Sequence, residues 1–449
     1  MAQFDLIIRG GTIVDGSGAE RFTGDVAVKN GLIVGVGDIA GDADREIDAA
    51  GKVVAPGFVD IHTHYDGQAT WDQEMAPSSW HGVTTVVMGN CGVGFAPAKP
   101  DRHEWLISLM EGVEDIPGTA LAEGITWDWE TFPEYLDAVE KLPRTVDVGT
   151  HVPHGAVRAY VLGDREQPGA VPTDDDIEKM SAIVEEGVRA GALGFSTSRT
   201  VLHKSGDGEL VPGTTATPEE LVAIGKAMGR AKDAGGHAVF EMASDLQRDW
   251  NEFEWMGKLS REAGIPVTFA ALESIAKEMP LKEQSATMRA ENDNGANIGA
   301  QIALRGNGII MAWQCTVNPV AVRPSWNEVK ELPWSEQKAK LHDPEFKKQL
   351  LSEANDYSEA PMDIIGVVMV ITQGWALQYE MDPDFDYEPD ETASVNARAN
   401  AAGIDPQEYA YDMLCRDDAT GFIYLPILNY ADGNLDFLPP LQHADDTVN

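Results

Sequence analysis

Short apolar segments alternate with amphipathic helical segments along most of the chain, and this alternation is the strongest constraint on its fold. Segments typical of strands begin near residues 193, 238, 267 and 309, at intervals of 45, 29 and 42 residues. Each interval is long enough for a helix that returns the chain to a neighbouring parallel strand. We therefore predict an α/β fold, either a (β/α)8 barrel or a doubly wound sheet.

Three further apolar segments precede these strands. They cover residues 53–64, 84–91 and 146–151, and their near-continuous apolar character is typical of parallel strands that are covered on both faces. The helical segments carry start signals of their own. Thr173 precedes one apolar-periodic segment, and Thr217-Pro218-Glu219-Glu220 is a capping box with proline at the first helical position.

The first fifty residues carry strand patterns without intervening helices. Asn30-Gly31 lies between two short apolar segments and predicts a hairpin, because both residues accept the positive φ of a type I′ turn. We predict a small β-sandwich part over residues 1–52 and a barrel over residues 53–449. Within the barrel, the charged, helical character of residues from about 326 to 401 indicates an insertion.

Composition excludes several classes of partner. The chain has 33 basic and 74 acidic residues, and a net charge of −41 disfavours binding to nucleic acid or to anionic membranes. Three cysteines, Cys91, Cys315 and Cys415, lie far apart, so we expect no disulfide framework and a cytoplasmic location. No signal peptide is predicted at the N-terminus, and the apolar segment 364–371 is too short to cross a bilayer.

The sharpest local signal is Asp60-Ile61-His62-Thr63-His64, at the end of the first predicted barrel strand. Residues two apart in a strand share a face, so we expect His62 and His64 to point the same way. Two neutral imidazoles side by side suit a zinc ion. The pattern is short, and it also fits two histidines that are satisfied by ordinary hydrogen bonds.

The residues around this pair resemble the amidohydrolase superfamily. Ala55–Asp66 is similar to its first barrel strand, and His81–Gly92 resembles the branch of N-acyl-D-amino-acid deacylases, or D-aminoacylases. The resemblance extends over Phe4–Asp436 and implies a metal-dependent (β/α)8 TIM-like barrel attached to a small β-sandwich. Three further segments match the same branch in the same order: Glu114–Pro117, His154–Arg158 and Gly191–Thr197.

The resemblance also implies a set of metal ligands. In this branch two histidines after the first strand and a cysteine after the second lie at the metal centre, and their counterparts here are His62, His64 and Cys91. A thiolate is a strong zinc ligand, and a bound metal lowers the pKa of the thiol. We therefore expect one or two Zn²⁺ ions at these residues.

The chain departs from the branch at its fifth and sixth strands. The histidine usual after the fifth strand is replaced by Glu241, whose carboxylate could ligate zinc or pair with a neighbouring cation. His237 has the same strand parity and is a weaker candidate. The sixth-strand segment 267–272 has no histidine, and the fourth-strand segment 193–198 has no lysine, which agrees with a cysteine-bearing branch.

Substrate-binding residues are expected in the loops after the strands, where barrel enzymes place their active sites. The candidates are His154 and Arg158 after the third strand, and Ser196 and Arg199 after the fourth. Either arginine could bind a substrate carboxylate through two parallel hydrogen bonds.

The general base of the superfamily is an aspartate after the eighth strand, and in this branch it follows a segment like Asn429–Asp436. No eighth strand is recognisable before Asn449. We therefore expect the C-terminal part of the fold to be missing from this sequence, and no catalytic residue is assigned.

Together these features predict a zinc-dependent hydrolase of linear amide bonds that acts on N-acyl-D-amino acids through metal-activated water. Two alternatives stay open at this point. One is an amidohydrolase that cleaves a cyclic amide or a lactone. The other is a non-catalytic barrel that binds a metal or a small molecule, which the lost histidines favour. We expect a small-molecule substrate and no nucleic-acid or membrane partner, and we leave a homo-oligomer open.

Overall fold

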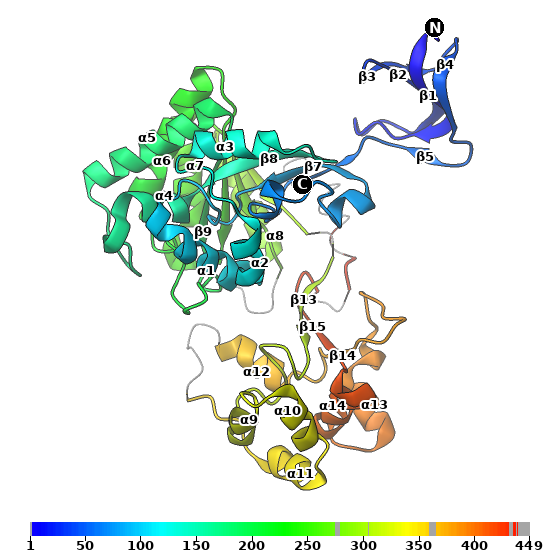
Figure 1. Ribbon diagram of the computed structural model, residues 1–449, viewed down its shortest axis with the longest axis vertical. Coiled ribbons are helices and arrows are strands. Elements are labelled where there is room, and N and C mark those ends of the chain that lie inside the picture. Colours follow the sequence, from blue (N-terminus) through cyan, green and yellow to red (C-terminus); the bar gives the residue numbers. More distant parts are fainter. Residues whose placement is uncertain are drawn as a thin grey trace. The chain divides into compact units, whose positions relative to one another are not determined.

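The chain divides into two compact units, which a computed structural model describes over residues 2–273, 279–303, 305–358, 365–430, 434–436 and 438 (Figure 1). Unit 1 comprises Met1–Thr63, Asp72–Met88 and Leu142–Gly149. Unit 2 comprises His64–Trp71, Gly89–Lys141 and Thr150–Asn449.

Unit 1 begins with a five-stranded sheet built around β1 (Phe4–Ile13). The order is β3-β2-β1-β4, and β5 (Val53–Val54) also pairs with β1. The antiparallel strands β2 (Phe22–Lys29) and β3 (Leu32–Gly37) are joined by Asn30 and Gly31, whose φ angles are 52° and 76°. The predicted hairpin is therefore confirmed. The remaining strand, β4 (Ala43–Asp48), runs parallel to β1.

A second sheet has seven strands in the order β12-β11-β10-β9-β8-β7-β6, so that each strand adjoins the next one along the chain. Parallel registers join β6 to β7 and connect β8 through to β12. This order and direction are those of a TIM-like barrel, and the predicted α/β class is confirmed. The strands are β6 (Phe58–Asp60), β7 (Val83–Met88), β8 (Asp147–Pro153), β9 (Gly194–Arg199), β10 (Val239–Ser244), β11 (Val267–Ala270) and β12 (Ile298–Gln301).

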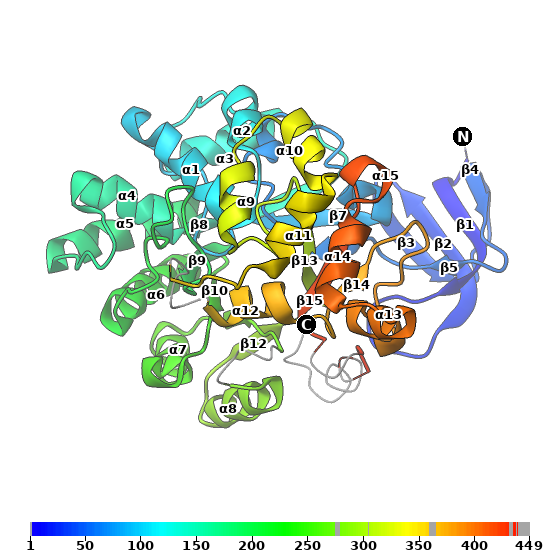
Figure 2. The ribbon, with the colours of Figure 1, turned by 90° about the horizontal axis from the view of Figure 1, so that it is seen from below.

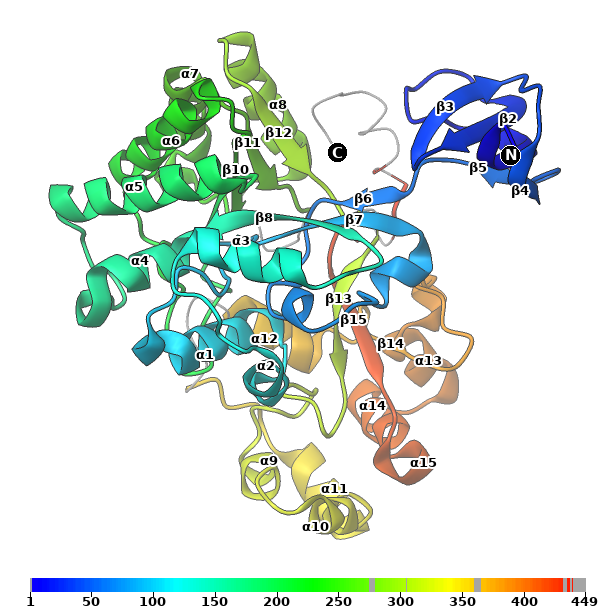
Figure 3. The same cartoon turned by 45° about the horizontal axis from the view of Figure 1, so that its top comes forward.

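Four helices of unit 2 alternate with the later strands of this sheet, and each packs against the next (Figure 3). Thr173 caps the first of them, as predicted, through a reciprocal pair of hydrogen bonds with Asp176. Gly225 allows the second and third helices to approach closely, since a Cβ there would lie 2.6 Å from Leu259 Cγ. The four are α5 (Asp174–Ala190), α6 (Pro218–Asp233), α7 (Glu252–Ala263) and α8 (Leu281–Asp293).

Shorter helices occupy the connections around β7 and β8. The α-helices are α1 (His103–Glu114), α2 (Gly118–Gly124), α3 (Phe132–Lys141) and α4 (His154–Leu162). Single 3₁₀ turns are η1 (Gln68–Thr70), η2 (Ser78–His81), η3 (Pro100–Arg102), η4 (Gly163–Arg165), η5 (Arg248–Trp250) and, later in the chain, η6 (Glu391–Ala393).

Later residues of unit 2 form an antiparallel sheet with a core of its own. The order is β13-β15-β14, with β13 at Asn307–Met311, β14 at Tyr379–Glu380 and β15 at Ile423–Leu428. Helices surround these strands (Figure 2) and bury an apolar cluster that includes Trp313 and Tyr411. They are α9 (Pro324–Val329), α10 (Trp334–Leu341), α11 (Pro344–Ser352), α12 (Ile365–Gln373), α13 (Val395–Ala402), α14 (Pro406–Leu414) and α15 (Arg416–Ala419).

Two strand predictions were wrong in detail. The segment 309–314 does not supply the seventh strand of the parallel sheet, because it contributes to β13 of the antiparallel sheet instead. The seventh strand is β12, whose four residues were too few to give a distinct apolar pattern.

The segment 53–64 is divided into β5 and β6 by Pro56-Gly57, since proline cannot donate to a strand ladder. Phe58 and Val59 are 66% and 57% exposed, so β6 is not the buried strand that was expected.

The domain boundary at residue 52 and the insertion over about 326–401 stay predictions. Over the described residues, none of the helices has both the length and the apolar character that crossing a membrane requires.

The cap of α5 provides a test of the helical layer. Replacing Thr173 with alanine removes the side-chain acceptor for Asp176 N–H, which should lower the free energy of unfolding by about 1 kcal/mol. Chemical denaturation followed by circular dichroism measures this change. Thr173→Ser keeps the acceptor and should behave like the unmodified protein, and equal losses in both variants would contradict the capping role.

Candidate metal centre

Cys91 lies in a turn directly after β7, and two neighbouring strands hold this turn in place. Gly89, Cys91 and Gly92 all have positive φ, which gives the backbone its sharp change of direction. Ser196 of β9 donates through Oγ to the Gly89 carbonyl and accepts from Gly92 N–H at 2.9 Å. Glu241 of β10 accepts from Cys91 N–H at 3.1 Å through Oε2. The buried Ser196 and Glu241 therefore position the Cys91 thiol.

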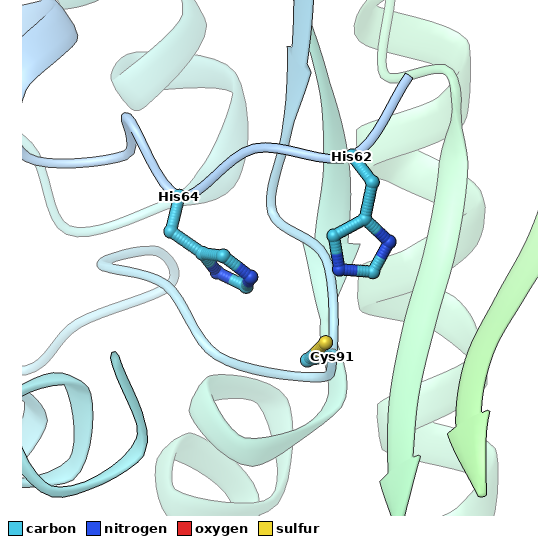
Figure 4. A group of neighbouring side chains, drawn as sticks. All are labelled: His62, His64 and Cys91. Atoms are coloured by element: carbon cyan, nitrogen blue, oxygen red, sulfur yellow. The ribbon is translucent and has the colours of Figure 1, made fainter. Parts of the chain in front are cut away.

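His62 and His64 follow β6 and lie outside any strand. One ligand atom of each, together with the Cys91 sulfur, lies within 4.8 Å of the others, and Figure 4 shows the three side chains turned toward one another. Between the histidines, Thr63 donates to the Val87 carbonyl from its N–H at 2.9 Å and from Oγ1 at 2.7 Å. The predicted convergence therefore comes from this anchored loop and not from strand parity.

A second group shares the Cys91 thiol. Ligand atoms of Cys91, Glu114 and His203 also lie within 4.8 Å of one another. Glu114 ends α1, and its Oε1 lies 3.3 Å from His64 Nε2. His203 follows β9, and its Nδ1 lies 2.9 Å from Ser198 Oγ.

Sequence reasoning assigned no ligand role to Glu114 or His203. The sequence signal that could have identified Glu114 is its place in Glu114–Pro117, a segment that matches the deacylase branch. His203 had only its place after the fourth predicted strand, and no spacing rule connects it to Cys91.

Acidic groups dominate the surroundings of the thiol. Burial raises the pKa of Asp66 to about 7, and burial followed by the charges of Asp66, Asp115 and Glu241 raises the pKa of Glu114 to about 8. Burial, followed by the carboxylates of Glu241, Glu114 and Asp66, also raises the pKa of the Cys91 thiol. These shifts favour protonated groups when no cation is present.

The donor set fits a zinc-type ion. Imidazole nitrogen and thiolate sulfur are the ligands that zinc prefers, and a bound divalent cation stabilises the ionised forms of nearby acids. Among the described residues, the buried Oδ2 atom of Asp66 has no hydrogen-bond partner, which is the kind of group that a cation or an ordered ligand satisfies.

His154 and Arg158, predicted to contact substrate, belong to a buried network around Glu220. His154 Nε2 lies 3.0 Å from Glu220 Oε1, and its Nδ1 lies 2.8 Å from Thr197 Oγ1. Arg158 Nη1 donates to both oxygens of Glu220 at 2.6 and 2.8 Å, and Nε donates to Glu166 at 3.1 Å. These bonds engage both side chains in contacts within the protein. Their predicted contact with substrate stays a prediction.

The same network explains the start of α6. Thr217 caps this helix by accepting from Glu220 N–H, which confirms one half of the predicted capping box. The Glu220 carboxylate is directed to His154 and Arg158, so it supports α4 and α6 together.

Arg199 and His237 lie in other surroundings. Arg199 Nε donates to Glu252 Oε1 at 2.7 Å, Nη1 donates to the Ala216 carbonyl at 2.6 Å, and the guanidinium lies over the Trp250 ring. Its role as a substrate ligand stays a prediction. His237 precedes β10 and lines a surface hollow beside Gly191, whereas Glu241 lies further along the strand at the Cys91 turn.

The segment expected to precede the general base lies partly outside the described residues. Within the segment Asn429–Asp436, residues 431–433 lie outside the described residues, as do 439–449. The expected general base was predicted beyond Asn449 and stays a prediction.

Comparison with known proteins identifies the family. A family model described as "Amidohydrolase family" matches residues 45–346. The chain belongs to the amidohydrolase family. D-aminoacylase of Alcaligenes xylosoxydans xylosoxydans is 32% identical over 268 residues, which are 60% of this chain and 50% of that protein. N-acyl-D-aspartate deacylase of the same organism is 35% identical over 256 residues, 55% of this chain and 47% of that protein.

The chain of this amidohydrolase thus spans about half the length of the curated relatives it matches. A crystal structure of D-aminoacylase has a TM-score of 0.56 and 23% identity, and the match covers 96% of this chain and 73% of that one. N-acyl-D-glutamate deacylase of Bordetella bronchiseptica, complexed with zinc and a phosphonate inhibitor, has a TM-score of 0.53 and 20% identity, with 94% and 72% covered. These structures share the fold, and the resemblance to the D-aminoacylase branch is confirmed.

The Glu220 network provides a test of stability. Glu220→Gln leaves the Arg158 guanidinium buried beside a neutral amide, and we expect the free energy of unfolding to fall by about 3 kcal/mol. Burial alone would raise the pKa of Glu220, but the hydrogen bonds and charges of His154 and Arg158 lower it in the folded protein, so its ionised form favours folding above the usual value of 4.5. The difference in unfolding free energy between Glu220→Gln and the unmodified protein should therefore become smaller as the pH falls below 4.5.

Urea denaturation at neutral and acidic pH measures this deficit. The adjacent, exposed Glu219 supplies a matched control, Glu219→Gln, which should leave stability almost unchanged. A Glu220→Gln variant as stable as this control at neutral pH would contradict the network's contribution.

Proposed function

We propose that this amidohydrolase is a zinc-dependent deacylase that cleaves the amide bond of N-acyl-D-amino acids. The observation that carries the proposal is the convergence of His62, His64 and Cys91 on a common point. The relatives named above as D-aminoacylase and N-acyl-D-aspartate deacylase support the reaction class and the D configuration.

His62, His64 and Cys91 would hold the metal, which fits their nitrogen and sulfur donors. A bound zinc ion acts as a Lewis acid on a carbonyl oxygen and lowers the pKa of bound water toward neutrality.

The chain's own residues prepare this centre in two ways. Ser196 and Glu241 fix the turn that carries Cys91, and Thr63 fixes the loop that carries both histidines. Rigid placement of ligands matters because small displacements weaken metal binding. The carboxyl group of Glu114 lies 3.3 Å from His64 Nε2 and contacts this ligand from the end of α1.

Hydrolysis of paired enantiomers tests the proposal. After zinc loading, the protein should release amino acid from N-acetyl-D-amino acids, and the L enantiomers should react at least about 10-fold more slowly. Cys91→Ala removes the sulfur ligand and should lower kcat/KM by about 100-fold or more.

The control is Cys315→Ala, which removes a thiol from the antiparallel part of unit 2 and should leave kcat/KM unchanged. Equal rates on both enantiomers would contradict the assigned substrate class. Full activity in Cys91→Ala would contradict the assigned metal ligand.

A further inference from the structure

We propose that a hollow at the first turns of α6 and α7 binds a free amino acid with an apolar side chain. The two helices pack against each other (Figure 3). None of the residues that line the hollow belongs to the candidate metal centre, so the inference does not depend on the proposed function.

The hollow is large enough for a small molecule. It has a volume of about 590 Å³, and its lining residues come from 214–219 around the start of α6 and from 249–258 around the start of α7, together with Arg199. Small-molecule sites in proteins have volumes of roughly 300–1,000 Å³. The hollow lies within this range.

Arg199 supplies a hydrogen-bond donor that the protein itself leaves unused. Its side chain is 6% exposed, Nε donates to Glu252 Oε1 at 2.7 Å, and Nη1 donates to the Ala216 carbonyl at 2.6 Å. The third nitrogen, Nη2, forms no hydrogen bond with a described residue. Because Arg199 lines the hollow, this nitrogen is left to donate to a carboxylate oxygen of a ligand.

The starts of the two helices add to the attraction for a carboxylate. Thr217 and Asn251, the N-cap residues of α6 and α7, both line the hollow. These helices have 16 and 12 residues, and the N–H groups of a first helical turn carry partial positive charge. That charge matters because the buried Glu252 carboxylate already pairs with Arg199.

Two tryptophans give the hollow an apolar wall. Trp250 and Trp255 line it, and the Arg199 guanidinium lies 5.0 Å from the centre of the Trp250 ring and 5.8 Å from that of Trp255. The Trp255 ring is fixed by donation from Nε1 to Glu252. A ligand whose carboxylate meets Arg199 can therefore pack an apolar side chain against these rings.

Exposed acids at the hollow disfavour a simple anion. Glu219, Asp249 and Glu254 are exposed lining residues, and Lys258 adds one exposed cation. Three carboxylates against one ammonium group repel phosphate and attract a cationic group. A buried donor for a carboxylate, surrounded by exposed acids, matches the two opposite charges of a free amino acid.

Isothermal titration calorimetry of the zinc-free full chain tests the site. The probes are D- and L-phenylalanine, 3-phenylpropanoate, which lacks the ammonium group, 2-phenylethylamine, which lacks the carboxylate, and inorganic phosphate. We expect at least one enantiomer of phenylalanine to bind at one site per chain. The other three probes should bind at least about 10-fold more weakly, because each lacks a charge-assisted contact.

Variants of the hollow assign the contacts. Arg199→Lys and Trp250→Leu should each weaken phenylalanine binding by about 10-fold, with circular dichroism to confirm folding. Glu254→Gln should weaken phenylalanine by about 3-fold and should not weaken 3-phenylpropanoate, because it removes attraction for the ammonium group alone. The matched control is Glu336→Gln, an exposed residue of α10, which should change neither affinity.

Several outcomes would overturn the proposal: no binding of either enantiomer, phosphate or 3-phenylpropanoate binding as tightly as phenylalanine, or unchanged binding in both Arg199→Lys and Trp250→Leu. If Arg199→Lys fails to fold, Trp250→Leu and Glu254→Gln decide. Cys91→Ala should bind phenylalanine like the unmodified protein, and a loss there would assign the ligand to the metal centre instead. Since binding is measured without zinc or hydrolysis, failure of this proposal leaves the proposed function untouched.

Discussion

The candidate site depends on the hydrogen bonds that fix the turn from Gly89 to Gly92. Three residues of positive φ within four positions are costly for a chain to adopt unless surrounding groups hold them. Ser196 and Glu241, one from each of two adjacent parallel strands, satisfy the backbone of this turn on both sides of the thiol. A parallel sheet makes this arrangement available because successive strands end at the same edge.

Electrostatics then determines what the thiol can do. Burial and the neighbouring carboxylates raise the pKa of the Cys91 thiol, and burial raises the pKa of Asp66 and of Glu114 as well. The same surroundings attract a divalent cation, because one ion compensates several groups at once. Binding of a divalent cation by these residues would therefore be coupled to the release of protons.

Other polar residues near the strand ends form buried hydrogen bonds that join helices and strands to one another. The His154–Glu220–Arg158 network connects α4 to the start of α6, and Arg199 connects β9 to Glu252 at the start of α7. Buried ion pairs with several hydrogen bonds restrict the geometry of the elements that they join. In the sequence these residues could not be distinguished from substrate ligands, because both kinds of residue are polar and follow an apolar strand.

The sequence by itself determined the α/β class, the hairpin at Asn30-Gly31, the caps of α5 and α6, and the segments that contain His62, His64 and Cys91. These features depend on local patterns, such as strand and helix periodicity, positive φ and capping side chains. Only the tertiary structure decided that β12 completes the parallel sheet while β13 joins another. It also decided that Glu114 and His203 meet at Cys91 and that Glu220 binds His154 and Arg158. These contacts join residues far apart in the chain, and packing of the helices and strands brings them together where no local pattern records their proximity.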